Sequence, residues 1–327
     1  MNIKKYNQEQ FLELFTNIVD QKINKSEVKK ILLEINEIGY SKEVFIGSAL
    51  ALKKKMLSIK APLNTIDVCG TGGDNLNSLN ISTAVSFVAA SCGVNIAKHG
   101  NKAISSRSGS ADIFTELQIP ILSNINEIEL SLKRNKLVFL FAPLFHDSLK
   151  NLSDIRKEIA SEFSSATIFN FLGPLLNPAN VKKQFIGTSR KDTMLPMIEA
   201  LNFMGSDSVY IVNGFDGMDE ISICDNSYLL KLKNKKISEI EVINPEKYSF
   251  KKVSINEIKG LDPKYNSSKL YDLLKGEKSA YRDIVILNTA FVLELSGFSK
   301  NITEGINQAK FAIDSGSSYR LLKKLSS

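Results

Sequence analysis

The sequence has 327 residues, 43% of them hydrophobic, so the chain is long enough to bury a large core and to form two domains. Its 18 glycines and 8 prolines are too few for a fibrous or disordered protein, and an excess of Lys and Arg gives a net charge of +7. No apolar signal sequence follows the N-terminal lysines, and no stretch offers the ~20 uninterrupted apolar residues of a membrane span, so we expect a cytoplasmic protein.

The positive charge has two explanations that composition leaves open. A positive cleft would attract an anionic small molecule, whereas nucleic acid would need a basic stripe. Many lysines fall in turns and on predicted helix surfaces, which favours scattered, solvated side chains. Cys69, Cys92 and Cys224 lie among apolar neighbours, so we expect reduced thiols and neither disulfides nor a zinc site.

The N-terminal part predicts a small helical unit. Three stretches place apolar residues at helical spacing: residues 8–20, 26–38 and 41–55. Ser26 and Ser41 are the expected N-caps of the second and third helices. Pro62 marks the junction to the first strand, so we expect residues 1–63 to form this unit.

A strand, a helix and a second strand follow. Residues 66–69 form an apolar strand that runs into Gly70-Thr71-Gly72-Gly73-Asp74, where glycine allows positive φ and lets an anion approach bare N–H groups. Residues 80–83 place Asn, Ser and Thr at the start of a helix, whose N-terminus would seat a phosphate. With a parallel strand at 94–97, both loops emerge at one edge of a sheet.

The loop expected after the second strand, residues 98–112, suits a polyanion. It holds three cations, four serines and two glycines but little that could form a core. Such a composition provides charge-assisted and backbone hydrogen bonds. A single Gly-rich turn is as often an ordinary tight loop, but two anion-suited loops on consecutive strand ends favour a binding site.

The remainder alternates strands and helices, which is typical of an α/β protein. We expect strands at 138–141, 185–188 and 209–212, and antiparallel strands within 221–242. We expect helices at 111–117, 125–133, 149–156, 194–204, 267–274, 284–296 and 302–315. The predicted fold is therefore a small all-helical N-terminal domain plus a large α/β domain, whose central, mostly parallel sheet is flanked by helices.

Three groups of residues could carry chemistry. Asp219 and Glu220 follow a predicted strand and supply the hard oxygen ligands that Mg²⁺ favours, although such a pair is more often a solvated turn. His99 and His146 are the only histidines, and either could act as a base. Arg156, taken by itself, reads as a surface residue of a helix.

Together the motifs resemble the anthranilate phosphoribosyltransferase family. The resemblance is carried by residues 70–74, 80–83, 98–101, 108–112, 141–143, 167–170, 172–175, 177–179, 216–220 and 281–283. These motifs lie in the family's order and cover nearly the whole chain. The resemblance implies an enzyme of tryptophan biosynthesis that transfers the 5-phosphoribosyl group from 5-phospho-α-D-ribose 1-diphosphate (PRPP) to the amine of anthranilate, with Mg²⁺ as cofactor.

The resemblance also implies a role for each matching position. The donor-binding residues would be Gly70, Gly73, Asp74, Ser78, Asn80, Ile81, Ser82, Thr83, Lys98, His99, Gly100, Asn101, Lys102, Ala103, Ile104, Ser105, Ser106 and Ser110. Gly70, Asn101 and Arg156 would bind the acceptor, and Ser82, Asp219 and Glu220 the metal. Because an aniline amine is unprotonated at neutral pH, no strong base is required, and His99 is expected first to shape its loop.

Further expectations concern the domains. The resemblance implies that residues 168–182 complete the helical domain, that 64–167 and 183–327 form the large donor-binding domain, and that two copies form a homodimer through the helical domain. The chain departs from the family's pattern in two places. Residues 159–166 form a longer segment beside the acceptor site, and residues 265–268 replace a Glu-Asn-Ala segment.

Two alternatives come from other classes. A nucleic-acid-binding relative of the same fold would account for the charge of +7, but a pure binder need not keep Asp219 and Glu220. A pyrimidine nucleoside phosphorylase of similar fold would have a different glycine and basic pattern from Lys98-His99-Gly100-Asn101. We therefore expect small-molecule substrates, with neither nucleic acid nor a membrane as partner.

Overall fold

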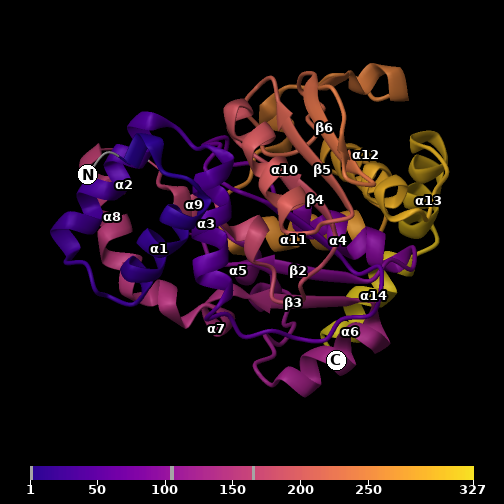
Figure 1. The fold of residues 1–327 in the computed structure, drawn as a ribbon. Coiled ribbons are helices and arrows are strands. Elements are labelled where there is room, and N and C mark those ends of the chain that lie inside the picture. Colours follow the sequence, from indigo (N-terminus) through magenta and orange to yellow (C-terminus); the bar gives the residue numbers. More distant parts are fainter. Residues whose placement is uncertain (1–2, 104–106, 164–165) are drawn as a thin grey trace.

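The computed structural model describes residues 3–103, 107–163 and 166–327. An eight-stranded sheet forms its centre, with helices on both faces and α1–α3 gathered at one end (Figure 1). The strands are β1 (Ile66–Gly70), β2 (Ile96–Gly100), β3 (Leu137–Phe141), β4 (Lys183–Gly187), β5 (Ser208–Gly214), β6 (Ser227–Lys233), β7 (Lys236–Ile237) and β8 (Glu241–Ile243).

The helices surround this sheet. They are α1 (Gln8–Val19), α2 (Lys25–Ile38), α3 (Lys42–Lys53), α4 (Ile81–Ser91), α5 (Ser110–Glu116), α6 (Ile125–Asn135), α7 (Ala142–Phe145), α8 (Ser153–Phe163), α9 (Ile168–Phe171), α10 (Met194–Phe203), α11 (Pro263–Leu274), α12 (Ala280–Ser296), α13 (Ile302–Asp314) and α14 (Ser317–Leu325). No helix within the described ranges combines the length and apolar character that a membrane crossing requires.

The strand order is β3-β2-β1-β4-β5-β6-β7, and β8 also pairs with β6. The first five strands of this order are parallel, and β6, β7 and β8 are antiparallel additions. All parallel strands therefore end at the same edge, where ligands bind in such sheets. The predicted α/β fold with a mostly parallel sheet is confirmed.

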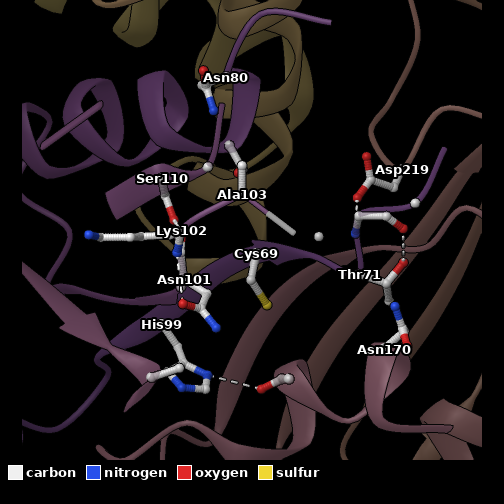
Figure 2. Close-up of a pocket in the computed structure, with 18 of the residues that line it drawn as sticks. Cys69, Thr71, Asn80, His99, Asn101, Lys102, Ala103, Ser110, Asn170 and Asp219 are labelled. Carbon is white, nitrogen blue, oxygen red and sulfur yellow. Dashed lines mark hydrogen bonds between the residues drawn. The ribbon is translucent and has the colours of Figure 1, made fainter. Parts of the chain in front are cut away.

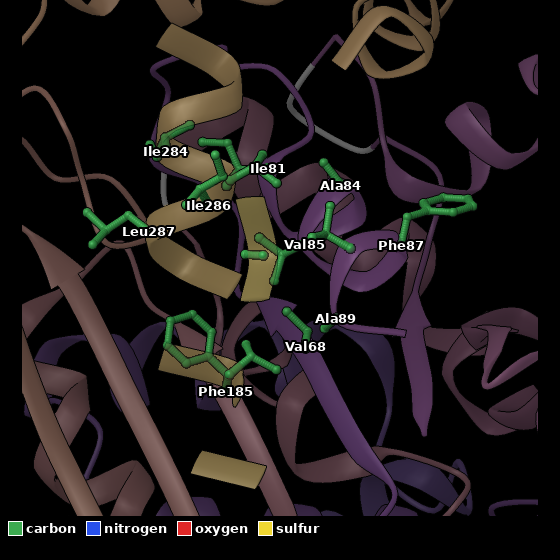
Figure 3. Close-up of a cluster of buried hydrophobic side chains, with 14 of the residues drawn as sticks. Val68, Ile81, Ala84, Val85, Phe87, Ala89, Phe185, Ile284, Ile286 and Leu287 are labelled. Carbon is green, nitrogen blue, oxygen red and sulfur yellow. The ribbon is translucent and has the colours of Figure 1, made fainter. Parts of the chain in front are cut away.

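Helix α4 is held in place by a buried cluster on one face of the sheet. Val85 and Ala89 of α4 pack with Val68 and Phe185 of the sheet and with Ile284 of α12 (Figure 3). Full burial of an aromatic or branched aliphatic side chain stabilises the fold by about 1.5–3 kcal/mol. The cluster therefore fixes where the N-terminus of α4 lies relative to the ends of the strands.

The other face of the sheet shares its core with the N-terminal helices. Cys69 and Ile186 of the sheet belong to one cluster with α10, α1–α3 and Ile159 of α8. Helix α8 also contacts α2 through an ion pair of 2.8 Å between the Lys29 Nζ and a Glu162 carboxylate oxygen. Helices α1–α3 therefore pack against α8 as well as against one another.

Three local predictions are wrong, and one helix has no counterpart among the predicted elements. The N-cap of α2 is Asn24, whose side chain accepts from the Glu27 N–H at 3.0 Å, and Ser26 lies inside the first turn. Strand β2 extends to Gly100 because its polar residues Lys98 and His99 find buried hydrogen-bond partners. The expected helix of 149–156 is a 3₁₀ turn (Asp147–Leu152) followed by α8, and the amphipathic α14 was not predicted.

Candidate active site

The predicted site residues converge on one cavity at the carboxyl edge of the parallel strands (Figure 2). The cavity has a volume of ≈ 320 Å³, and every described residue of the predicted donor, acceptor and metal sets lines it. Ile104, Ser105 and Ser106 lie outside the described residues. The structure thus brings these side chains together, while their assignment to particular ligands remains a prediction.

The Gly-rich turn after β1 is shaped by the loop after β5. The N–H of Gly72 donates to the Asp219 carboxylate at 2.8 Å, and Gly72 and Gly73 have φ of 66° and 81°. A Cβ on Gly70 would lie 2.2 Å from an Asp219 carboxylate oxygen. A side chain at residue 70 would therefore displace the Asp219 carboxylate from the Gly72 N–H, and because of this bond the Gly72 N–H is not available to an anion.

Lys98 is a buried residue of β2 and not part of a loop. Its Nζ donates to the carbonyl of Val68 at 2.8 Å and to the Ser82 hydroxyl at 3.1 Å. Burial lowers the pKa of Lys98, and the nearby carboxylates of Asp67 and Glu220 oppose this shift. Only 2% of Lys98 is exposed, and in this buried position its charge acts strongly on the nearby carboxylates of the cavity.

The backbone pairing between strands β1 and β2 is interrupted towards the cavity. Within these two described strands the register pairs Ile66 with Ile96 alone, whereas β1 and β4 pair along five residues. Side chains take over beyond that point, because the N–H of His99 donates to the carboxylate of Asp67 at 3.1 Å. The Lys98 side chain also takes part, because its Nζ bonds the Val68 carbonyl of β1.

His99 and His146 form a buried pair. The Nδ1 of His99 lies 3.0 Å from the carbonyl of Gly173, and the two Nε2 atoms lie 3.2 Å apart. Because a carbonyl only accepts, we assign the proton of His99 to its Nδ1. Burial is the largest cause that lowers the pKa of His99 to about 3 and of His146 to about 4, so both are neutral at pH 7.

This neutral pair predicts acid sensitivity of the fold. Both histidines have a lower pKa in the folded protein than the ordinary 6.5 of the unfolded chain. As pH falls below 6.5, the histidines of the unfolded chain therefore bind protons before those of the folded protein. The stability that the neutral pair provides above pH 6.5 is lost as pH falls towards 4. The pair should account for a loss of about 3–4 kcal/mol in the free energy of unfolding between pH 7.5 and pH 5.

Urea unfolding at these two pH values measures the effect in the wild type and in the His99→Asn/His146→Asn variant. We expect a shallower pH dependence in the variant, whatever its absolute stability. Parallel slopes for the two proteins would mean that the pair does not titrate with unfolding.

Three carboxyl groups crowd one wall of the cavity. Burial and the charge of Asp219 raise the pKa of Asp74 to about 7, and burial also raises the pKa of Asp219 and of Glu220. Glu220 accepts a hydrogen bond from the backbone of Ser82, at the N-terminus of α4. Among the described residues, no three His, Cys, Asp or Glu side chains are grouped so as to hold a metal by themselves. The residues nevertheless fit a divalent cation, which would relieve the repulsion between these hard oxygen donors.

Arg156 of α8 reaches the cavity from the opposite side. Its guanidinium carbon lies 5.9 Å from the centroid of the Phe169 ring, and burial lowers its pKa. In the described part of the chain Arg156 forms no ion pair, so its fork of N–H donors is open to a planar carboxylate.

Comparisons with known proteins bear on this site. Residues 63–319 match the family described as "Glycosyl transferase family, a/b domain". An anthranilate phosphoribosyltransferase of Bacillus cereus (strain B4264) is 40% identical over 309 residues, which cover 94% of this chain and 89% of that protein. The chain belongs to the anthranilate phosphoribosyltransferase family. It is a glycosyltransferase of tryptophan biosynthesis that moves the 5-phosphoribosyl group from PRPP to anthranilate, as the motifs predicted.

Solved structures agree with this membership. Anthranilate phosphoribosyltransferase from Thermus thermophilus superimposes with a TM-score of 0.89 at 27% identity, covering 98% of this chain and 95% of that one. The enzyme from Saccharomyces cerevisiae in complex with PRPP and Mg has a TM-score of 0.86 at 26% identity, covering 97% and 91%. The predicted family is confirmed, and both alternative classes are set aside.

Several residues of this family member's site escaped the sequence-based assignment. Asp67 supports His99, while Thr71 accepts the Ser189 N–H at 3.3 Å and so ties the Gly-rich turn to the loop after β4. Phe169 and Asn170 line the cavity beside Arg156. Residues 167–170 were noted as a family motif, which is the one signal that could have placed the last two in the site.

Proposed function

We propose that this cavity is where the transfer takes place, with the donor's diphosphate beside the N-terminus of α4 and the acceptor beside Arg156. One observation carries the proposal. A helix N-terminus, which favours anions, adjoins a buried cluster of carboxyls, so a diphosphate and a divalent cation would complement each other there. PRPP and Mg are bound by the yeast relative, and we propose the same two ligands here.

In this proposal Asp219, Glu220 and Ser82 would hold Mg²⁺ beside the diphosphate of the donor. The cation would neutralise charge that develops on the leaving diphosphate. The chain itself contributes the positive end of α4, the hydroxyls of Ser82 and Thr83, and the buried charge of Lys98 beneath Ser82. Stabilisation of the leaving group is the main task, because the attacking amine is already unprotonated.

On the acceptor side we propose that Arg156 binds the carboxylate of anthranilate, with Asn101 and Gly70 near its amine and ring. All three residues line the same cavity. The Nε2 of His99 is engaged by His146, which favours a positioning role for His99. The cavity between helical and α/β elements would exclude water from a donor that otherwise hydrolyses.

Arg156→Ala tests this placement. We expect the KM for anthranilate to rise by about 20-fold or more, because a bidentate, charge-assisted pair is lost, while the KM for PRPP changes less than about threefold. Steady-state kinetics in both substrates give the comparison, and Lys157→Ala on the same helix is the exposed control. Equal increases in both KM values would remove Arg156 from the acceptor site.

The overall proposal is tested by the loss of anthranilate fluorescence on mixing the protein with PRPP, with and without Mg²⁺. A loss that requires Mg²⁺ is the expected result. Turnover at the same rate after complete removal of divalent cations would contradict the metal site, and binding of PRPP without turnover would contradict the acceptor site.

We also propose a division of the chain, an assembly and a location. The helical domain would comprise residues 1–63 and 168–182, and the large domain would comprise residues 64–167 and 183–327. In this division α8 belongs to the large domain and contacts α2 of the helical domain. Two copies would pair through the helical domain. Cys69, Cys92 and Cys224 are free thiols, and free thiols persist in the cytoplasm, where we place the protein.

A further inference from the structure

The segment that opens α4 is bonded to a part of the chain nearly two hundred residues later. The N–H of Leu79 donates to the carbonyl of Ile258 at 2.9 Å, and the N–H of Gly260 donates to the carbonyl of Asn77 at 2.7 Å. A Cβ on Gly260 would lie 2.8 Å from the carbonyl oxygen of Ser78. The segment 77–79 is therefore paired tightly with the segment 258–260.

Asn80 is the centre of this connection. It occupies the N-cap position of α4, but its side chain caps no helix N–H. Its Nδ2 donates to the carbonyl of Ser108 in the loop after β2 at 3.2 Å, and its Oδ1 accepts from the Nδ2 of Asn266 at 3.0 Å. Its backbone carbonyl accepts from the Tyr281 hydroxyl at 3.0 Å.

The orientation of both amides follows from their backbone partners. The Ser108 carbonyl can only accept, so the Nδ2 of Asn80 faces it. The Leu261 N–H can only donate, so the Oδ1 of Asn266 faces it at 2.8 Å. The remaining atoms, the Nδ2 of Asn266 and the Oδ1 of Asn80, then match as donor and acceptor. A carboxylate in place of the Asn266 amide would set two acceptors against each other.

Both supporting side chains are themselves buried. Asn266 is 2% exposed and Tyr281 is 3% exposed, and neither lines the cavity. Asn80, by contrast, lines the cavity together with Ser82 and Thr83 on one side and Ser108 to Ser110 on the other. A buried, fully matched polar network of this kind specifies one arrangement of the groups that it joins.

We infer that Asn266 and Tyr281 are positioning residues for PRPP, which act through Asn80 to hold the start of α4 and the loop after β2 in the donor-binding arrangement. This inference rests on the proposed donor site. Asn266 belongs to the segment 265–268 in which the chain departs from the family's pattern, and Tyr281 belongs to a motif, residues 281–283, to which the resemblance gave no role.

The experiment measures the Kd for PRPP with Mg²⁺ by calorimetry, and both KM values, in wild type, Asn266→Asp and Tyr281→Phe. We expect Asn266→Asp to weaken PRPP binding about tenfold or more and Tyr281→Phe about threefold or more, with the KM for anthranilate changed less than about twofold. Asn256→Asp changes an exposed amide, and Tyr271→Phe removes a hydroxyl that is bonded to Tyr319; neither residue lines the cavity, so both variants should bind PRPP like the wild type.

Tyr281→Phe removes a single hydroxyl, and the Asn80 carbonyl still accepts from the Ala84 N–H at 3.2 Å, so we expect this variant to fold. It therefore tests the inference even if Asn266→Asp does not fold. An unchanged Kd for PRPP in folded Tyr281→Phe, or equal changes for both substrates, would overturn the inference. Failure of the wild type to bind PRPP would instead overturn the proposed donor site.

Discussion

Replacing both Asp219 and Glu220 by alanine is expected to lower kcat/KM by about 1,000-fold or more, with no recovery at high Mg²⁺. The two carboxylates lie at the N-terminus of α4 and beside the Gly-rich turn, where a leaving diphosphate would develop charge. Without them the loop after β5 would bring no carboxylate to the lining of the cavity.

Single variants separate the metal role from a structural role. Asp219→Asn keeps an oxygen that can accept the Gly72 N–H, so a purely structural Asp219 would tolerate this change. We expect instead a large rise in the Mg²⁺ concentration needed for half-maximal rate. Asp207→Asn, on an exposed residue before β5, serves as the control. Wild-type dependence on Mg²⁺ in Asp219→Asn would contradict the assignment.

The convergence of the site residues could be predicted from sequence because it follows from topology. An apolar strand, a capped helix and a second strand form a parallel unit, and the loops of such units emerge at one edge. Gly70 and Asp219 are far apart in the chain, yet each belongs to the end of a strand of this kind or to the loop after it. Their proximity therefore needed only the fold class and the strand positions.

The partners of buried polar residues could not be predicted in the same way. Lys98 and His99 read as loop residues because charge and polarity end the apolar pattern, and they lie in β2 only because Val68, Ser82 and Asp67 satisfy them. The pairing of His99 with His146, and of Asn80 with Asn266, depends on elements brought together by tertiary packing. Local periodicity carries no information about such contacts.

Arg156 illustrates the limit of residue patterns. Its helix spacing is that of a surface residue, and only the family resemblance pointed to the acceptor site. In the structure its helix α8 packs on α2, and this packing directs the guanidinium into the cavity beside Phe169. The longer segment 159–166, which is partly outside the described residues, begins within that same helix.

Gly187→Ala is expected to have the second largest effect, although Gly187 does not line the cavity. Gly187 lies between Gly70 and Val212 in the sheet, and a Cβ there would be 1.5 Å from the backbone carbonyl oxygen of Asp219. The obstacle is backbone, so no rotation of a side chain can relieve the overlap. The loop that carries Asp219 and Glu220 would have to move away from the Gly-rich turn.

We expect Gly187→Ala to lower kcat/KM by about 100-fold or more and to reduce the free energy of unfolding by about 1–3 kcal/mol, because overpacking displaces both the loop and the strands beneath it. Kinetics and urea unfolding measure the two effects. Gly305→Ala is the matched control, because its Cβ would lie 2.8 Å from the backbone oxygen of Ala290 in the contact between α13 and α12, away from the cavity. That variant should lose stability but keep its kcat and KM values. A Gly187→Ala variant that lost stability but kept its kcat/KM would contradict this prediction. It would mean that the contact between Gly187 and the backbone of Asp219 does not position Asp219 for catalysis.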